Sequence, residues 1–552
     1  MMNVSQTIIQ LLHNRGIEGE SEIQEFLSSK PKRTYNPSLL DDLEAGVDFL
    51  LEKVKTGAKI CIYGDYDADG ITSTTLMLSI LGHLMPEERL DYYIPSRFEE
   101  GYGLNKDAIL SIFKKGFDLI VTVDCGSVSA GEVQYAKELG MDIIVTDHHN
   151  ITDTMAECLL INPKKPGSKY PFQELCGCGV AFKMAQLIQK KCGLPKHVLT
   201  EVLDLVAIGT MGDIMPLVDE NRTMAKFGLQ VVNSGSRYGL KKLMEGAGLH
   251  PGQITSENIS YVIVPHLNAS GRIEDASQAV ELLSAKDGDP ETDEIVEDLL
   301  FKNRERKRLQ QETFEECVEM VRNSGTDDFL LIESENAHEG IAGIAAGKIK
   351  DEFYRPTVLV TPSGDQKQYL KGTGRSIEGV DLYSLLKNHE DLFEKFGGHK
   401  SACGFLMKKE NFRLLKDGLL ADMKVLLTEN PALFVRKHPV DMELPFEDIS
   451  LQLAEELEQL APFGNKNPKP AFRISPVRIR DVRLMGATGK HVRFNIFDGR
   501  GRSLTCVLFN KAEKYMDTLT SGNIVSVIGS LEVQTWQNVT RLQMITDEIE
   551  YL

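Results

Sequence analysis

The chain has 552 residues, of which 42% are hydrophobic and 26% charged, and its formal net charge is −19. The length predicts about three or four domains of ordinary globular composition. The negative total argues against a surface coated uniformly with nucleic-acid-binding charge, but a local basic groove is compatible with it. No apolar stretch approaches a membrane span, and the N-terminus lacks the basic segment of a secretory signal. The nine cysteines lack zinc-type spacing, which predicts reduced thiols and a cytoplasmic protein.

The stretch Lys59–Gly70, KICIYGDYDADG, places carboxylates directly after a buried strand. The β-branched run Lys59–Tyr63 predicts the strand, and the apolar spacing over residues 71–84 predicts the next helix. The carboxylates between them belong to Asp65, Asp67 and Asp69. Crowded acids raise one another's pKa values unless a cation lies among them, so this turn predicts a metal site. An EF-hand loop is excluded because its twelfth position is Leu76 rather than Glu. A solvated acidic turn without a ligand stays open on this stretch alone.

Two later strands are also followed by polar residues. The apolar run 118–123 ends at Asp124, and the run 141–146 ends at Asp147-His148-His149. Strands separated by helices pair in parallel, so their carboxyl ends meet at one edge of the sheet. Asp213, after a predicted helix over residues 198–208, adds a further acid. We therefore expect side chains that are far apart in the sequence to converge at this edge.

The chemistry of this donor set predicts the metal and the reaction. Carboxylate oxygen predominates over imidazole, which favours Mn²⁺ or Mg²⁺ over zinc. The acids suffice for two ions about 3.5–4 Å apart with one bridging carboxylate. Such a pair clamps a phosphoryl group and activates a water molecule, so phosphoester hydrolysis is the predicted chemistry.

Several motifs resemble a known family. GDYDADG, VDCG, DHH and GTMGDIMPL, in this order, resemble the DHH phosphoesterase superfamily. PSRFEEGYGL, HLNASGRI and FGGHKSACG are similar to the RecJ family within it, bacterial exonucleases that degrade single-stranded DNA from the 5′ end. The resemblance runs from about residue 40 to the C-terminus. It implies a 5′→3′ exonuclease that hydrolyses single-stranded DNA by a two-metal mechanism and acts in DNA recombination and repair.

The resemblance also implies which residues hold the metal ions. The six implied ligands are Asp65 and Asp67 for one ion, Asp69, His148 and Asp213 for the other, and Asp124 as the bridge. Which of Asp65 and Asp67 binds directly stays open. His149 would face the scissile phosphate, while Asp147 would orient an adjacent imidazole.

The substrate is expected to contact residues from several motifs. By resemblance, Asn268 and Arg272 in HLNASGRI form a phosphate-contacting pair, and the fork of a guanidinium matches two phosphate oxygens. A pocket for the nucleotide and its terminal 5′ phosphate would involve Arg97, Thr373, Arg375, Gly397, Gly398 and His399. GTGRS, residues 372–376, is expected to form a glycine-lined turn.

The predicted fold class is α/β. It consists of a DHH-type parallel-sheet domain, a long connecting helix, a second α/β (DHH-associated) domain and a C-terminal OB-like β-barrel. The expected bounds are 1–40 for a helical arm, 41–290 for the catalytic domain, 291–325 for the helix, 326–440 for the nucleotide-binding domain and 441–552 for the barrel. Within the barrel, residues 471–510 carry eight Lys and Arg against two Asp, which predicts a groove for single strands. The basic run 302–308 on the connecting helix is either a solvated face or a DNA-lining surface.

Two other functions are compatible with parts of the sequence. A phosphoesterase for pyrophosphate, cyclic dinucleotides or short RNA would use the same metal site, but the basic tail argues against it. A non-catalytic scaffold is disfavoured because every implied ligand is present. Single-stranded DNA is the expected partner, and the protein is expected to be a monomer without membrane contact. The resemblance adds a single-strand-binding protein and a RecQ-type helicase as partners.

Overall fold

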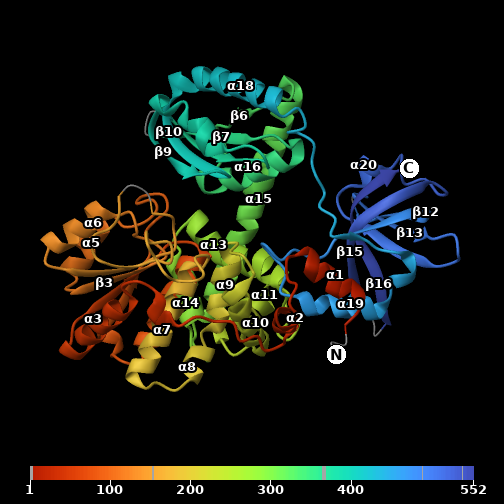
Figure 1. Ribbon diagram of the computed structural model, residues 1–552. Coiled ribbons are helices and arrows are strands. Elements are labelled where there is room, and N and C mark those ends of the chain that lie inside the picture. Colours follow the sequence, from red (N-terminus) through yellow and green to blue (C-terminus); the bar gives the residue numbers. More distant parts are fainter. Residues whose placement is uncertain (1–3, 152–153, 364–367, 488, 537–538) are drawn as a thin grey trace. The chain divides into compact units, whose positions relative to one another are not determined.

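The computed structural model describes residues 4–151, 154–363, 368–487, 489–536 and 539–552 (Figure 1). The chain divides into two compact units. The first comprises Met1–Val264, Val280–Asp289 and His438–Leu552, and the second comprises Pro265–Ala279 and Pro290–Lys437. None of the helices formed by the described residues is long and apolar enough to cross a membrane.

A five-stranded parallel sheet in the order β2-β1-β3-β4-β5 organises the first unit. Its strands are β1 (Ile60–Tyr63), β2 (Leu90–Tyr93), β3 (Leu119–Val123), β4 (Asp142–Thr146) and β5 (Leu159–Ile161). Every residue of β1 and β3 is buried, as expected for parallel strands covered on both faces. The predicted parallel pairing is confirmed, so the polar residues after β1, β3 and β4 share one edge.

Helices cover both faces of this sheet (Figure 1). α5 (Lys106–Lys114) and α6 (Ala130–Glu138) lie on one face, and α3 (Leu43–Thr56), α4 (Ala68–Leu81) and α7 (Gly177–Cys192) lie on the other. α4 begins earlier than predicted because the Asp67 carboxylate caps it, accepting hydrogen bonds from the N–H groups of Asp69 and Gly70.

The helix predicted over residues 198–208 is wrong in its extent. The chain instead forms α8 (His197–Thr200) and α9 (Leu203–Gly212), with Asp213 as the C-cap of α9. α10 (Asp219–Ser234), α11 (Tyr238–Gly246), α12 (Ser256–Asn258) and a π-helical turn (Ile259–Ile263) follow.

A buried ion pair joins α7 to α10. Lys183 Nζ lies 2.6 Å from Glu220 Oε2, and both side chains are fully buried. The same ammonium donates hydrogen bonds to Thr34 Oγ1 and the Tyr35 carbonyl, so the segment before α3 is bound to the helical layer.

The C-terminal sheet has the order β11-β12-β13-β14-β16-β15 and closes through an additional β12–β15 pairing. Its strands are β11 (Met442–Glu443), β12 (Phe472–Met485), β13 (His491–Phe497), β14 (Ser503–Leu508), β15 (Ile524–Trp536) and β16 (Val539–Tyr551). The N-terminal helices α1 (Gln6–Asn14) and α2 (Glu20–Leu27) contribute Ile8, Leu11, Leu12 and Ile23 to the core of this barrel. The barrel core is therefore assembled from both ends of the chain.

The second unit contains a mixed sheet in the order β6-β7-β8-β10-β9, in which β6 pairs with β7 in parallel and the other neighbouring strands pair antiparallel. Its strands are β6 (Leu330–Glu333), β7 (Thr357–Ser363), β8 (Tyr369–Arg375), β9 (Phe393–His399) and β10 (Ala402–Lys408). Its helices are α13 (Val264–Ile273), α15 (Thr292–Ser324), α16 (Glu339–Phe353), α17 (Leu382–Lys387) and α18 (Phe412–Glu429), while α14 (Ser277–Ser284) spans the division between the units. The long helix is confirmed as α15, visible in green in Figure 1.

The glycine-lined turn expected at residues 372–376 is wrong. β8 continues through Arg375, and Thr373 and Arg375 pair with Gly404 and Ala402 of β10. A Cβ at Gly372 would lie 2.2 Å from the Phe405 ring. This glycine therefore allows close packing within the sheet rather than a turn.

Candidate metal centre

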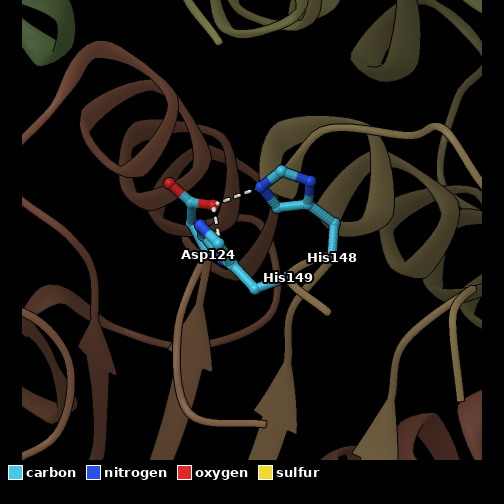
Figure 2. Close-up of side chains that lie close together, drawn as sticks. All are labelled: Asp124, His148 and His149. Atoms are coloured by element: carbon cyan, nitrogen blue, oxygen red, sulfur yellow. Dashed lines mark ion pairs between the residues drawn. The ribbon is translucent and has the colours of Figure 1, made fainter. Parts of the chain in front are cut away.

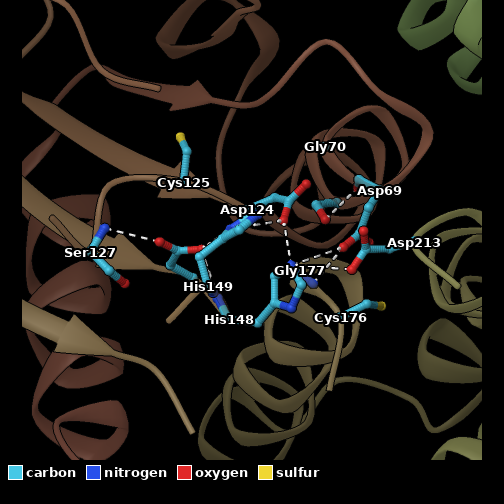
Figure 3. Close-up of polar contacts among 12 residues, drawn as sticks. Asp69, Gly70, Asp124, Cys125, Ser127, His148, His149, Cys176, Gly177 and Asp213 are labelled. Atoms are coloured by element: carbon cyan, nitrogen blue, oxygen red, sulfur yellow. Dashed lines mark hydrogen bonds and ion pairs between the residues drawn. The ribbon is translucent and has the colours of Figure 1, made fainter. Parts of the chain in front are cut away.

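Acidic and imidazole side chains from four chain segments converge at the carboxyl edge of the parallel sheet (Figure 3). His148 Nε2 lies 3.1 Å from Asp124 Oδ1, 3.5 Å from Asp213 Oδ2 and 3.8 Å from Asp69 Oδ2. Asp69 comes from the start of α4, Asp124 follows β3, His148 follows β4, and Asp213 follows α9. The convergence expected from the parallel topology is therefore present.

Three groups of residues each offer donor atoms within 4.8 Å of one another. The groups are Asp65, Asp67 and Asp124; Asp69, His148 and Asp213; and Asp124, His148 and His149. The first two correspond to the two ligand sets that the family resemblance implies. Figure 2 shows Asp124 beside both imidazoles, with its Oδ1 3.1 Å from His148 Nε2 and 4.0 Å from His149 Nδ1. The binding of metal by these residues stays a prediction.

Several buried polar atoms of this centre have no hydrogen-bond partner among the described residues. They are Asp65 Oδ1, Asp124 Oδ1 and both ring nitrogens of His148, although His148 Nε2 and Asp124 Oδ1 lie 3.1 Å apart. Leaving such groups unsatisfied costs about 1–3 kcal/mol each, and more for charged groups. A cation bound among them would satisfy these atoms, so the donor set fits divalent ions that prefer oxygen ligands.

The electrostatics of the carboxylates lead to the same conclusion. Burial, and then the charge of Asp69, raises the pKa of Asp124 well above its usual value. Burial and the charge of Asp67 raise the pKa of Asp69 to about 6, and burial with the charge of Asp69 raises the pKa of Asp213 to about 8. Positive charge placed among these groups would stabilise their ionised forms.

The N-terminus of α7 also supports the centre, a contribution that sequence analysis missed. The N–H groups of Gly177 and Cys178 donate to the two carboxylate oxygens of Asp69 at 2.6 and 2.9 Å (Figure 3). A Cβ at Gly177 would lie 2.5 Å from Asp124 Cβ, so only glycine permits this approach. The run CGCG ahead of an apolar helix was the available signal.

His149 is oriented by two neighbours. Asp147 Oδ1 lies 2.8 Å from its Nδ1, and Asp147 Oδ2 accepts a hydrogen bond from the Ser127 N–H. Burial alone would lower the pKa of His149, but the hydrogen bond and charge of Asp147 outweigh it and raise that pKa to about 9. The Tyr102 hydroxyl lies 2.9 Å from the same ring nitrogen. Within the motif PSRFEEGYGL, Arg97 was predicted as a site residue and Tyr102 was not.

Arg97 lies at the same edge. Its guanidinium carbon is 4.3 Å from the centre of the Tyr66 ring, and Tyr66 stands between Asp65 and Asp67 in the sequence. Burial raises the pKa of Asp65, and the charge of Arg97 partly opposes this shift. Arg97 Nε is buried without a hydrogen-bond partner among the described residues.

The other predicted substrate residues lie in the second unit. In the strand register, Gly404 pairs with Thr373 on one side and with Gly397 on the other. Ala402 likewise pairs with Arg375 and with His399. Thr373, Arg375, Gly397 and His399 therefore share one face of the sheet. Gly398 alternates to the other face. On α13, Arg272 Nη1 donates to the Gly340 carbonyl at 3.0 Å, and Asn268 Oδ1 is buried without a partner among the described residues.

Some of the basic residues from which the sequence predicts a DNA-binding groove are paired with acids in the barrel. Arg473 is paired with Glu550, and Arg502 with Asp498 and Glu447. The exposed arginines that project outward from β12 and β13 are Arg478, Arg480, Arg483 and Arg493. Arg480 also lies over the Phe497 ring at 4.7 Å.

Three family models match successive parts of the chain. The DHH family N-terminal domain matches residues 59–210, the DHHA1 domain matches 327–424, and the RecJ OB domain matches 440–548. The order of these matches agrees with the predicted order of the parallel-sheet domain, the second α/β domain and the barrel.

Similar proteins cover nearly the whole chain. The single-stranded-DNA-specific exonuclease RecJ of Bacillus subtilis is 37% identical over 546 residues, which are 99% of this chain and 68% of that protein. The RecJ of Escherichia coli is 31% identical over 569 residues, covering 98% and 95%. The crystal structure of RecJ from Thermus thermophilus in complex with Mn²⁺ aligns with a TM-score of 0.81 at 26% identity, covering 98% of this chain and 75% of that one. A structure of exonuclease RecJ bound to manganese aligns with a TM-score of 0.61 at 30% identity, covering 72% and 98%. With this agreement along its length, the chain belongs to the RecJ family of DHH proteins.

Proposed function

We propose that the protein is a metal-dependent 5′→3′ exonuclease that hydrolyses the phosphodiester bonds of single-stranded DNA. The observation that carries this proposal is the cluster of buried and half-buried carboxylates with an imidazole, whose donor atoms lie within 4.8 Å of one another in two sets. Membership of the RecJ family, whose relatives are named as single-stranded-DNA-specific exonucleases, supports the substrate.

The proposed ligands divide between two divalent cations, Mn²⁺ or Mg²⁺. Asp65 and Asp67 would hold one, Asp69, His148 and Asp213 the other, and Asp124 both. The bound pair would polarise the phosphodiester and lower the pKa of an attacking water molecule. Complexes of Thermus thermophilus RecJ with Mn²⁺ and with Mg²⁺ support this choice of metal.

Other side chains would position the phosphate. The imidazole of His149, fixed by Asp147 at 2.8 Å, would donate a charge-assisted hydrogen bond to a phosphate oxygen. Arg97 would add a guanidinium from the same edge. Within the second unit, Asn268, Arg272, Thr373, Arg375, Gly397, Gly398 and His399 are the proposed contacts to the nucleotide and its 5′ phosphate.

The proposed domains are residues 1–40, 41–290, 291–325, 326–440 and 441–552, with DNA recombination and repair as the cellular role. The proposed partners beyond single-stranded DNA are a single-strand-binding protein and a RecQ-type helicase, and the proposed state is a monomer. All nine cysteines are free thiols, which supports a reducing compartment such as the cytoplasm.

Digestion of end-labelled oligonucleotides tests this function. Single strands labelled at the 5′ or the 3′ end, and the matching duplex, are incubated with Mn²⁺, Mg²⁺ or chelator. The expected result is metal-dependent loss of the single strand, with a labelled mononucleotide appearing first from the 5′ end. Phosphate release from pyrophosphate without degradation of DNA would overturn the proposal in favour of a small-molecule phosphoesterase.

A further inference from the structure

A groove of about 600 Å³ opens next to Asp213 in the first unit. Its walls come from the end of α9, from the π-helical turn and from the segment just before β12. Its main apolar side chains are Met211, Ile214, Met215, Leu217, Tyr261 and Phe463. The charged side chains lining it are Glu257 and Lys469, and Lys469 is paired with Glu532 at 3.5 Å. With so little net charge, the groove is better suited to apolar ligand surface than to a phosphate backbone.

Ile214 is exposed in this groove in a conformation that β-branched residues rarely adopt. Its φ is +54°, and 71% of its surface is exposed. Asn465 holds the segment at both ends: its side-chain amide donates to the Ile214 carbonyl at 2.7 Å, and its own carbonyl accepts from the Leu217 N–H at 2.8 Å. The strain is therefore maintained by contacts from the segment just before β12, and such strain concentrates at functional sites.

Tyr261 provides a large aromatic surface along the same groove. It is 76% exposed, although its π-turn neighbours Ile259 and Ile263 are buried. π-helical turns recur at functional sites, where they change the direction in which a side chain projects. An exposed ring beside a groove offers a flat face on which another ring can stack.

We propose that this groove binds unpaired nucleobases of the DNA strand being degraded, with Tyr261 as the stacking surface and Ile214 as an apolar wall. The inference rests on the proposed nuclease function and adds a determinant of single-strand specificity to it. Nucleobases expose their faces only when unpaired, since a duplex buries them in its own stack. Gly212 and Ile214, the chain neighbours of Asp213, both line the groove, so a base bound there would lie beside a proposed metal ligand.

Abasic substrates test the proposal. A single abasic residue is moved outward from the 5′ end, one nucleotide at a time, and KM and kcat are measured for each oligonucleotide. For the wild-type protein, we expect at least one position at which the abasic residue raises KM about tenfold, the value of one base–aromatic stack. In Tyr261→Ala, KM for the unmodified strand rises and the penalty at that position disappears, whereas Tyr261→Phe retains it.

Tyr551→Ala is the matched control, because Tyr551 is 67% exposed on β16 and does not line the groove. It should show the wild-type abasic penalty at each position. If wild-type protein degrades DNA but shows no penalty at any position, or if Tyr261→Ala keeps the full penalty, the inference is overturned while the nuclease function stands. If wild-type protein leaves unmodified single strands intact, the proposed function itself fails.

Discussion

Replacing Gly177 by alanine should impair catalysis although it adds only one methyl group. The new Cβ would lie 2.5 Å from Asp124 Cβ. Ordinary carbon–carbon contacts are about 3.5–4.0 Å, so one side has to move by about 1 Å. Asp124 Cβ is bonded directly to the backbone and cannot rotate away. Either the Asp124 carboxylate or the two N–H groups that donate to Asp69 must therefore move.

A misplacement of about 1 Å in an active site costs about a hundredfold in rate, while overpacking costs about 1–3 kcal/mol of stability. The assay is kcat/KM on a 5′-labelled single strand with saturating Mn²⁺, with circular dichroism to verify folding. Gly131→Ala is the matched control: Gly131 also lies in the first turn of a helix, and outside its chain neighbours and its own helix backbone no described atom lies within 4 Å of the position that its new methyl group would occupy. A folded Gly177→Ala protein with kcat/KM within about twofold of wild type would refute this account of how the glycine acts.

Four further results are expected. Asp124→Asn should lower kcat/KM by more than about a hundredfold, and in chelator it should unfold at a higher temperature than wild type because one charge leaves a crowded acidic cluster; a lower unfolding temperature contradicts the repulsion. Mn²⁺ added to chelated wild type should stabilise it by about 2.7 kcal/mol at a hundredfold excess over Kd, and an unchanged thermal unfolding curve argues against a bound ion. Lys183→Met leaves the buried Glu220 carboxylate without its cationic partner, so denaturant titration should show a loss of about 3–5 kcal/mol, whereas Lys286→Met at an exposed pair should change stability by less than about 1 kcal/mol. Combined Arg483→Glu and Arg493→Glu should weaken binding of single strands and reduce the salt slope by about 0.7 per lost phosphate contact, and an unchanged slope places the DNA elsewhere.

The parallel sheet and the convergence of acids could be predicted because each strand reads as a short apolar run that ends in polar residues. Alternating helices force parallel pairing, and parallel pairing places Asp69, Asp124 and His148 at one edge. The long helix α15 could be predicted equally well, since its helical pattern runs without interruption over residues 292–324. Local patterns of this kind determine both elements.

Features that depend on contacts between distant segments could not be predicted in this way. The hydrogen bond from the Gly177 N–H to Asp69 depends on the packing of α7 against α4, and no local sequence pattern encodes that packing. The glycines of β8 suggested a turn because the sequence does not distinguish a glycine in a loop from a glycine that packs under an aromatic ring within a sheet. Tyr102 was missed for a similar reason, since its partner His149 follows a different strand.

The sharing of one apolar core by segments far apart in the chain has a consequence for biosynthesis. Ile8, Leu11 and Leu12 leave the ribosome long before the strands that bury them. A nascent chain therefore carries an amphipathic helix without its docking site until the barrel strands have been made. Any truncation that deletes the barrel also exposes this helix, so such a fragment reports on solubility as well as on DNA affinity.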